Sequence, residues 1–153
     1  MSGDLLWNFA ALRPLRRKLE LLGGLDVRRL LDVLGSELEN QTRRRISEEK
    51  TSPDGEPWQE WSDDYAARRP SKGGLLELRG DLLDSITYEV GNDAVTVGSK
   101  MLYAAIHQDG SVYGPLQKGQ GRIPARPFLG VSTENLEDLG ALTIEFIARE
   151  FGR

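Results

Sequence analysis

Residues 101–130 read MLYAAIHQDGSVYGPLQKGQGRIPARPFLG, and the predicted fold is organised around this stretch. An apolar and aromatic segment ends at Gln108, a glycine-containing loop follows from Asp109 to Arg122, and the segment IPARPFLG comes last. We call this last segment, residues 123–130, the strap. The rest of the chain is expected to supply the helices and the sheet that support this stretch.

The strap contains two prolines, Pro124 and Pro127, which fix φ at their own positions and favour extended backbone at the residues before them. Such a segment loses little conformational entropy when it docks. We expect it to deliver Phe128 and Leu129 into a pocket as preset anchors and to hold Arg126 outward. The pattern is typical of a strap across a sheet or of an interface element.

Nothing in the central stretch matches a known site for chemistry. His107 is the sole histidine and the chain has no cysteine, which is a poor basis for a zinc site or a catalytic triad. The glycines at 114–121 do not form a phosphate loop, because Lys118 stands at the wrong position. We predict no catalytic, cofactor-binding or metal-binding residue and no enzymatic activity. His107 is expected to be structural, hydrogen-bonded to a carbonyl or carboxylate, and a hydrolase using it is the less favoured alternative.

Residues 1–22 carry apolar side chains at helical spacing and are predicted to form an N-terminal helical arm, with Pro14 starting its second part. The densest basic run, residues 13–18, lies in this arm. It could contact a membrane or DNA, although packing on the chain's own domain or on the next subunit is the commoner use. After Gly23-Gly24, Asp26 is a plausible N-cap for a long helix over residues 25–49.

Five further elements are predicted after the long helix. Residues 51–61 form a loop in which Trp58 and Trp61 anchor the chain to the core, although tryptophans can also stack on bases or sugars. Short helices are expected from Ser62 to Arg69 and over residues 80–86, and a hairpin over residues 87–98. A helix capped by Ser132 runs to about Phe151.

These elements predict one domain over residues 1–153 with an α+β fold. A small, mainly antiparallel sheet packs against the long N-terminal helix and the C-terminal helix, and one of its strands is expected to come from the central stretch. Within the domain, residues 1–22 are the arm and residues 25–153 the main body.

Composition excludes several classes of protein. The net charge is −4, so bulk electrostatics do not favour nucleic acid, and no run of about 20 apolar residues predicts a membrane span. Without cysteine there are no disulfides, and without a secretory pattern the cytoplasm is the expected place of synthesis. Charge is uneven, because residues 1–50 carry a net +2 and residues 132–153 a net −3. The two ends could attract each other within one chain or between neighbouring chains.

An ordered set of motifs resembles the virion morphogenesis (tail completion) family of tailed bacteriophages. The resemblance covers roughly residues 30–135 and is carried by a basic helix end, a Ser-Pro-Asp-Gly-x-x-Trp loop, a Leu-x-x-x-Gly-x-Leu-x-x-Ser-Ile segment, a hairpin ending in Val-Gly-Ser and two parts of the central stretch. In this sequence the motifs are Arg43–Ile46, Ser52–Trp58, Leu76–Ile86, Val97–Ser99, Tyr103–Gly110 and Ile123–Gly130.

The resemblance implies a structural, non-catalytic protein of the phage neck or tail end. It implies a homo-oligomeric ring, a hexamer, that completes or terminates the tail and joins it to the head, with other neck, tail-tube or sheath proteins as partners. DNA would be touched only as it passes through the lumen, and the protein would be in the virion after assembly in the host cytoplasm. The alternative is a nucleic-acid-binding morphogenesis factor that uses Arg13–Lys18 and Arg43–Arg45.

Two groups of residues follow from this reading. The predicted subunit or partner interface comprises Arg43, Arg44, Arg45, Gly114, Leu116, Gln117, Lys118, Arg122 and Arg126. The predicted structural anchors are Trp58, Trp61, Tyr103, His107, Pro127 and Phe128.

Overall fold

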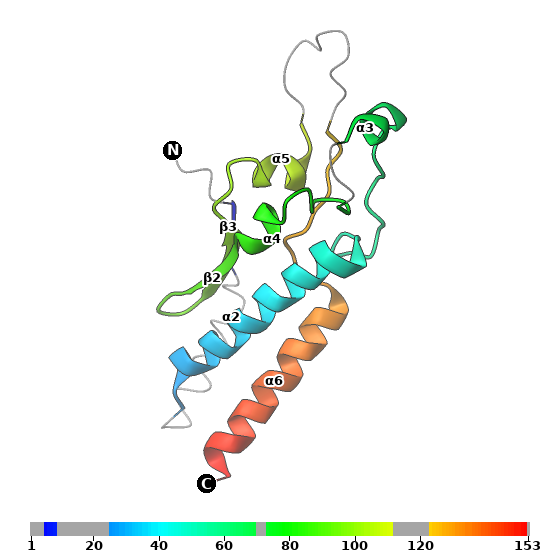
Figure 1. Ribbon diagram of the computed structural model, residues 1–153. Helices are drawn as coiled ribbons and strands as arrows, with labels where there is room; N and C mark the ends of the chain where they lie inside the picture. Colours follow the sequence, from blue (N-terminus) through cyan, green and yellow to red (C-terminus); the bar gives the residue numbers. More distant parts are fainter. Residues whose placement is uncertain (1–4, 9–24, 70–72, 112–122, 153) are drawn as a thin grey trace.

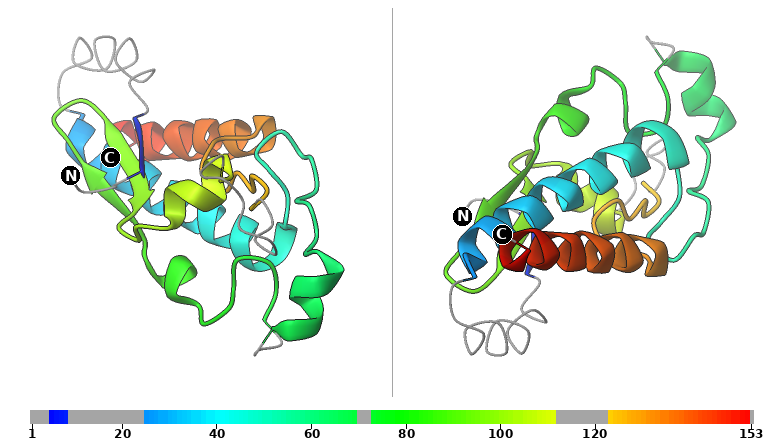
Figure 2. Two further views of the ribbon diagram at one scale, coloured as in Figure 1. Left: turned by 90° about the horizontal axis from the view of Figure 1, so that it is seen from above. Right: turned by 90° about the horizontal axis from the view of Figure 1, so that it is seen from below.

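The computed structural model describes residues 5–8, 25–69, 73–111 and 123–152. In chain order the elements are β1 (Leu5–Asn8), α2 (Val27–Arg44), the π-helical turn η2 (Arg45–Glu49), α3 (Asp63–Arg68), α4 (Asp81–Asp84), β2 (Ile86–Val90), β3 (Val95–Ser99), α5 (Ala104–Asp109) and α6 (Thr133–Phe151). Helix α2 packs on the sheet with one side and on α6 with another, and α6 runs antiparallel to it (Figures 1 and 2). The α+β prediction is therefore confirmed.

The sheet has three antiparallel strands in the order β1-β3-β2. The β2–β3 hairpin was predicted, but the origin of the third strand was wrong. Residues 5–8 form that strand, with Leu5 opposite Ser99, rather than the first turn of a helical arm. Four residues are too few to form a stable helix alone, whereas pairing satisfies the free edge of β3. The remainder of residues 1–22 lies outside the described residues.

The central stretch supplies a helix instead of a strand. Residues 104–109 form α5, where Ala104 and Ala105 favour helix over strand. The turn ends at Gly110, whose φ is +78°, a value that glycine adopts without strain.

The long helix begins as predicted at Asp26, whose carboxylate accepts a hydrogen bond from the Arg29 amide at 3.0 Å. Its continuation through η2 ends at Lys50, which has left-handed backbone. Gly35 faces the sheet, and a Cβ there would lie 2.3 Å from the Tyr88 ring and 2.7 Å from Val95. The absence of a side chain at this position therefore lets α2 approach the sheet closely.

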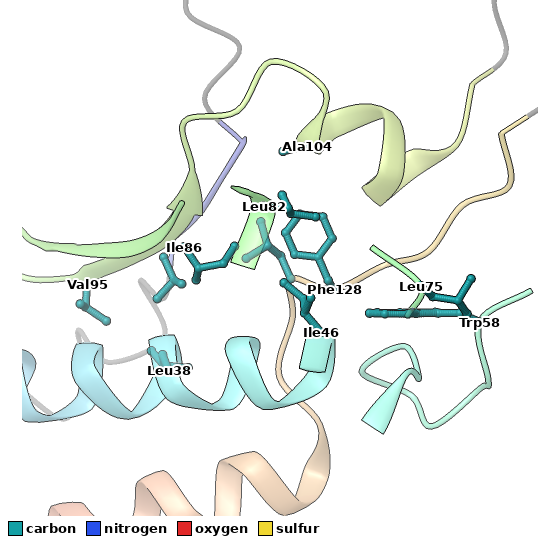
Figure 3. Packing of buried hydrophobic residues seen from close by; sticks show 11 residues of the cluster. Leu38, Ile46, Trp58, Leu75, Leu82, Ile86, Val95, Ala104 and Phe128 are labelled. Carbon is teal, nitrogen blue, oxygen red and sulfur yellow. The ribbon is translucent and has the colours of Figure 1, made fainter. Parts of the chain in front are cut away.

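The main core lies between α2, the hairpin, α5 and the strap (Figure 3). Phe128 is fully buried there, and Leu129 lies beside it in the same cluster. A second cluster joins α2 to α6, with Leu30 and Leu34 packed against residues that include Leu139 and Phe146. The predicted caps are also present, because Ser132 and Asn135 form a capping box at α6 and Ser62 caps α3. None of the described helices is long and apolar enough to cross a membrane.

Two helical glycines test the α2–sheet contact. Alanine at either Gly35 or Gly140 gains about 1 kcal/mol of helix propensity. Gly140 has open space at its Cβ position, so Gly140→Ala is expected to stabilise the protein. Gly35→Ala overpacks the core, at a cost of about 1–3 kcal/mol, and is expected to lower the free energy of unfolding measured in urea. Equal stabilisation by both substitutions would contradict the packing described for Gly35.

Candidate functional site

The strap is held by side chains that bond its backbone. Four successive carbonyls each accept a hydrogen bond from a buried or partly buried side chain, although none of the described strands pairs with this segment. The pairs are Pro127 with Trp58 Nε1 (3.0 Å), Phe128 with Arg45 Nη1 (3.0 Å), Leu129 with Gln108 Nε2 (3.1 Å) and Gly130 with Arg45 Nη1 (3.0 Å). Side chains therefore satisfy the groups that a sheet partner would otherwise satisfy.

Gln108 makes three hydrogen bonds to the backbone of the strap. Its Oε1 accepts from the amides of Phe128 and Leu129, both at 3.0 Å, while its Nε2 donates to the Leu129 carbonyl. The buried carboxamide thus presents a donor and an acceptor to the strap, as the backbone of a neighbouring strand would. The signal in the sequence was the position of Gln108 at the end of an apolar helix, but its role was missed.

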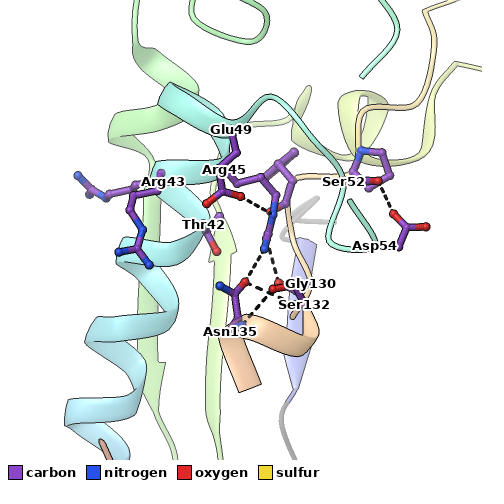
Figure 4. Close-up of polar contacts among 12 residues, drawn as sticks. Thr42, Arg43, Arg45, Glu49, Ser52, Asp54, Gly130, Ser132 and Asn135 are labelled. Atoms are coloured by element: carbon purple, nitrogen blue, oxygen red, sulfur yellow. Dashed lines mark hydrogen bonds and ion pairs between the residues drawn. The ribbon is translucent and has the colours of Figure 1, made fainter. Parts of the chain in front are cut away.

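Arg45 connects the strap to both long helices (Figure 4). Only 1% of the residue is exposed. Besides the two strap carbonyls, its Nη2 donates to Asn135 Oδ1 at 2.6 Å, which belongs to the α6 capping box. Burial lowers the pKa of Arg45, and the Glu49 carboxylate, 3.9 Å from Nε, opposes that shift. The prediction that Arg45 belongs to an interface was therefore wrong, since its guanidinium is enclosed by the fold.

Arg126 is also buried, so the expectation that the strap holds it outward was wrong. Its guanidinium donates to the carbonyls of Gln59 at 2.9 Å and Glu60 at 3.4 Å, in a loop without regular backbone pairing. Burial lowers the pKa of Arg126, with Glu60 acting in the opposite direction. A long cationic side chain supplies donors that this irregular loop lacks.

Among the other predicted interface residues, Arg43 and Arg44 are at the surface. Arg43 pairs with Glu39 at 3.1 Å and donates to the Ile86 carbonyl at 3.0 Å, while Arg44 pairs with Glu37 at 3.4 Å. Their charges are partly neutralised within α2. Gly114, Leu116, Gln117, Lys118 and Arg122 lie outside the described residues.

The predicted anchors lie against the core in different ways. Trp58 and Phe128 are buried, Pro127 is half-buried, and Trp61 and Tyr103 pack at the margin of the core. The Arg69 guanidinium lies 3.4 Å from the Trp61 ring centre, in cation–π contact.

His107 packs edge-on against Tyr103, with 5.7 Å between the ring centres. Burial lowers the pKa of His107, and the nearby positive charge of Arg126 adds to the shift. The neutral ring is therefore favoured at neutral pH. Its buried Nδ1 has no hydrogen-bond partner among the described residues, contrary to the bond expected there. No group of three or more potential metal ligands occurs in the described part of the chain.

Two exposed apolar surfaces remain. The first, the α6 outer face, consists of Leu136, Gly140, Ile144 and Phe151. The second, the α5 patch, consists of Leu102, Ile106 and Ile123. It lies at the other end of the molecule, where the Ser111 amide bonds the Ile123 carbonyl at 2.9 Å. Leu136 stands three residues before the core-facing Leu139, a helical spacing that predicts burial, but 58% of it is exposed.

The chain matches a family of known proteins over most of its length. The phage virion morphogenesis family matches residues 9–147 of the chain. This chain belongs to the phage virion morphogenesis family. The match extends beyond residues 30–135 at both ends, so it includes α2, the hairpin, the strap and most of α6. The resemblance read from the ordered motifs is confirmed.

Proteins similar to this chain occur in phage Mu and in a Mu-like prophage. The G protein of Escherichia phage Mu, whose name proposes a role in capsid assembly, is 33% identical over 141 residues, which cover 79% of this chain and 90% of that protein. A Mu-like prophage G protein 1 of Haemophilus influenzae is 26% identical over 129 residues, which cover 80% of this chain and 79% of that protein. No solved structure gives a significant match. A role in phage particle assembly follows from the family.

The contacts of Gln108 predict that a Gln108→Glu variant of this protein has a folding stability that depends on pH. In Gln108→Glu the introduced carboxyl faces two amides and one carbonyl, so only its protonated form can replace both functions of the amide. Burial and the Leu129 carbonyl favour the protonated carboxyl, and the two amides oppose them only in part, because they can also donate to the carbonyl oxygen of the protonated group. We therefore expect a folded-state pKa above the unfolded value of about 4.3. Stability relative to wild type should therefore be best below the unfolded pKa and fall as pH rises through the folded pKa.

Urea unfolding across a pH series measures this effect. At neutral pH we expect a loss of about 1–3 kcal/mol or more, because a buried acceptor then faces a carboxylate. Gln108→Leu is the control. Leucine has no titratable group, so the stability lost relative to wild type should be the same at every pH. A deficit of Gln108→Glu that stays constant with pH would show that Gln108 does not donate to the strap.

Proposed function

We propose that the chain is a structural subunit of the phage neck or tail end, forming a ring that completes or terminates the tail and joins it to the head. The observation that carries this proposal is the pair of exposed apolar surfaces on different elements, the α6 outer face and the α5 patch. Contiguous apolar side chains on a folded domain commonly mark protein contacts. Two such surfaces suit a subunit that binds neighbours on two sides.

A head-to-tail contact joins one surface of a subunit to a different surface of the next, and we take the α6 outer face as one of these two surfaces. A repeated head-to-tail contact generates a closed ring when the rotation between subunits closes, and an open filament when it does not. We propose a closed ring and take six subunits as the size to test. The α5 patch is then available to other neck, tail-tube or sheath proteins, because it lies at the opposite end of the molecule from most of α6 (Figure 1).

In this proposal the protein has no catalytic role. DNA contacts it only while passing through the lumen of the ring, and the finished protein is found at the neck or tail of the virion after assembly in the host cytoplasm. The rigid attachment of the strap by Arg45, Gln108 and Trp58 supports such a role, since a ring subunit has to hold its shape under contact with partners.

The nucleic-acid-binding alternative has less support. Arg45 is enclosed by the strap and the α6 cap, and Arg43 and Arg44 are paired with carboxylates on α2. Three of the cations that this alternative requires are therefore partly or wholly engaged. Salt-dependent binding of DNA, with a slope set by the phosphates neutralised, would revive it.

The test is to inactivate the gene in the phage or prophage that encodes the chain and to image the lysate by negative-stain electron microscopy. A neck or tail-end role predicts filled heads and separate tails that do not join. Purified wild-type chain added to the lysate should restore infectious particles, while chain that has been heat-denatured should not.

Two results would contradict the proposal. A lysate without normal heads would assign the chain to capsid assembly, the role that the name of the Mu relative proposes. A lysate with normal particles, in which heads are joined to tails, would show that the chain is needed neither for capsid assembly nor for joining the tail to the head.

A further inference from the structure

The α6 outer face is apolar over most of the length of the helix. Ile144 is 71% exposed, Leu136 58% and Phe151 49%, and Gly140 lies between the first two with open space at its Cβ position. These residues are separated by four, four and seven positions, so they share one side of the helix. At 1.5 Å per residue the face is about 22 Å long.

This face is additional to the one that packs on α2. The α2 contact uses Leu139, Leu142, Phe146 and Ile147. The apolar part of the helix surface is thus wider than α2 covers, and α6 has room for a second apolar neighbour beside α2. The charged residues of α6 occupy most of the rest of its exposed surface.

The neighbour of this face should be basic as well as apolar. Helix α6 carries five carboxylates and one arginine, a net charge of −4. Three of those carboxylates, on Glu134, Glu137 and Asp138, are exposed, and none of the ion pairs found among the described residues includes them. An apolar helix flanked by cations would satisfy both properties.

One segment of the sequence has this chemistry. Residues 12–22, LRPLRRKLELL, carry leucines at positions 12, 15, 19 and 22, which is helical spacing. The same segment carries four cations and one glutamate, a net charge of +3. Its charge is therefore opposite to that of α6 and its apolar spacing suits packing along a helix.

We propose that the α6 outer face of one copy binds residues 12–22 of a second copy. The inference rests on the proposed self-assembly and specifies its contact. A ring needs contacts between copies, so the occupant is residues 12–22 of a neighbouring copy, and the crosslinking experiment below distinguishes it from the same segment of the same chain.

Disulfide trapping tests the proposal in the full-length protein, because the natural chain has no cysteine. Chains carrying Leu15→Cys are mixed with chains carrying Ile144→Cys and oxidised with copper phenanthroline. Leu102→Cys, in the equally exposed α5 patch, replaces Ile144→Cys in the control. We expect about tenfold more crosslinked heterodimer with Ile144→Cys than with the control, because bound thiols have a high effective concentration.

Charge exchange provides a second measurement. The pair Glu137→Lys and Asp138→Lys on the Ile144→Cys chain should reduce crosslinking, and Arg16→Glu with Arg17→Glu on the Leu15→Cys chain should restore it. All the α6 positions are exposed, so circular dichroism and thermal unfolding should match wild type.

Three results would overturn the proposal. One is a crosslink within a single chain that carries both Leu15→Cys and Ile144→Cys, in place of one between chains. Another is preferential pairing of Ile144→Cys with itself, and the third is crosslinking no higher than in the control. The gene-inactivation experiment is independent of these variants, so a neck or tail-end role can stand while this contact fails.

Discussion

The buried guanidinium of Arg45 is the interaction on which the rest of the structure depends. A charge removed from water is costly unless oxygen atoms surround it. Here Phe128, Gly130 and Asn135 supply those oxygens, and Glu49 lies nearby. One side chain at the end of α2 thereby fixes the strap, the start of α6 and the corner between them. Phe128 enters the core because its backbone is held in this way.

The sequence predicted the elements whose cause is local. Asp26, Ser62 and Ser132 cap helices where expected, and the hairpin forms around its turn. The strap was also recognised, since two prolines restrict its backbone. What could not be read was which long-range partner each polar side chain finds. Arg45 and Arg126 look like surface cations in a sequence, and their burial depends on carbonyls that come from 83 and 67 positions away.

Two other errors have the same physical origin. The strand at residues 5–8 exists because β3 offers an open edge, which helical periodicity over residues 1–22 could not reveal. Leu136 follows the helical apolar pattern of α6 but lies beyond the reach of α2. Apolar periodicity predicts that a side chain is buried, but it does not predict which element or which neighbouring chain buries it. In a protein of a phage assembly family, we interpret such uncovered apolar side chains as sites for neighbouring subunits.

Amide hydrogen exchange in an Arg45→Met variant tests most directly whether Arg45 fixes the strap. The variant has a side chain of similar length, but it leaves the Phe128 and Gly130 carbonyls unpaired and removes one of the two donors to the Asn135 amide oxygen. We predict a loss of about 2–6 kcal/mol in the free energy of unfolding, at about 1–3 kcal/mol for each unpaired carbonyl, with the Phe128 and Leu129 amides losing protection before those of the β2–β3 hairpin. Wild-type stability together with unchanged protection of these two amides would contradict the account.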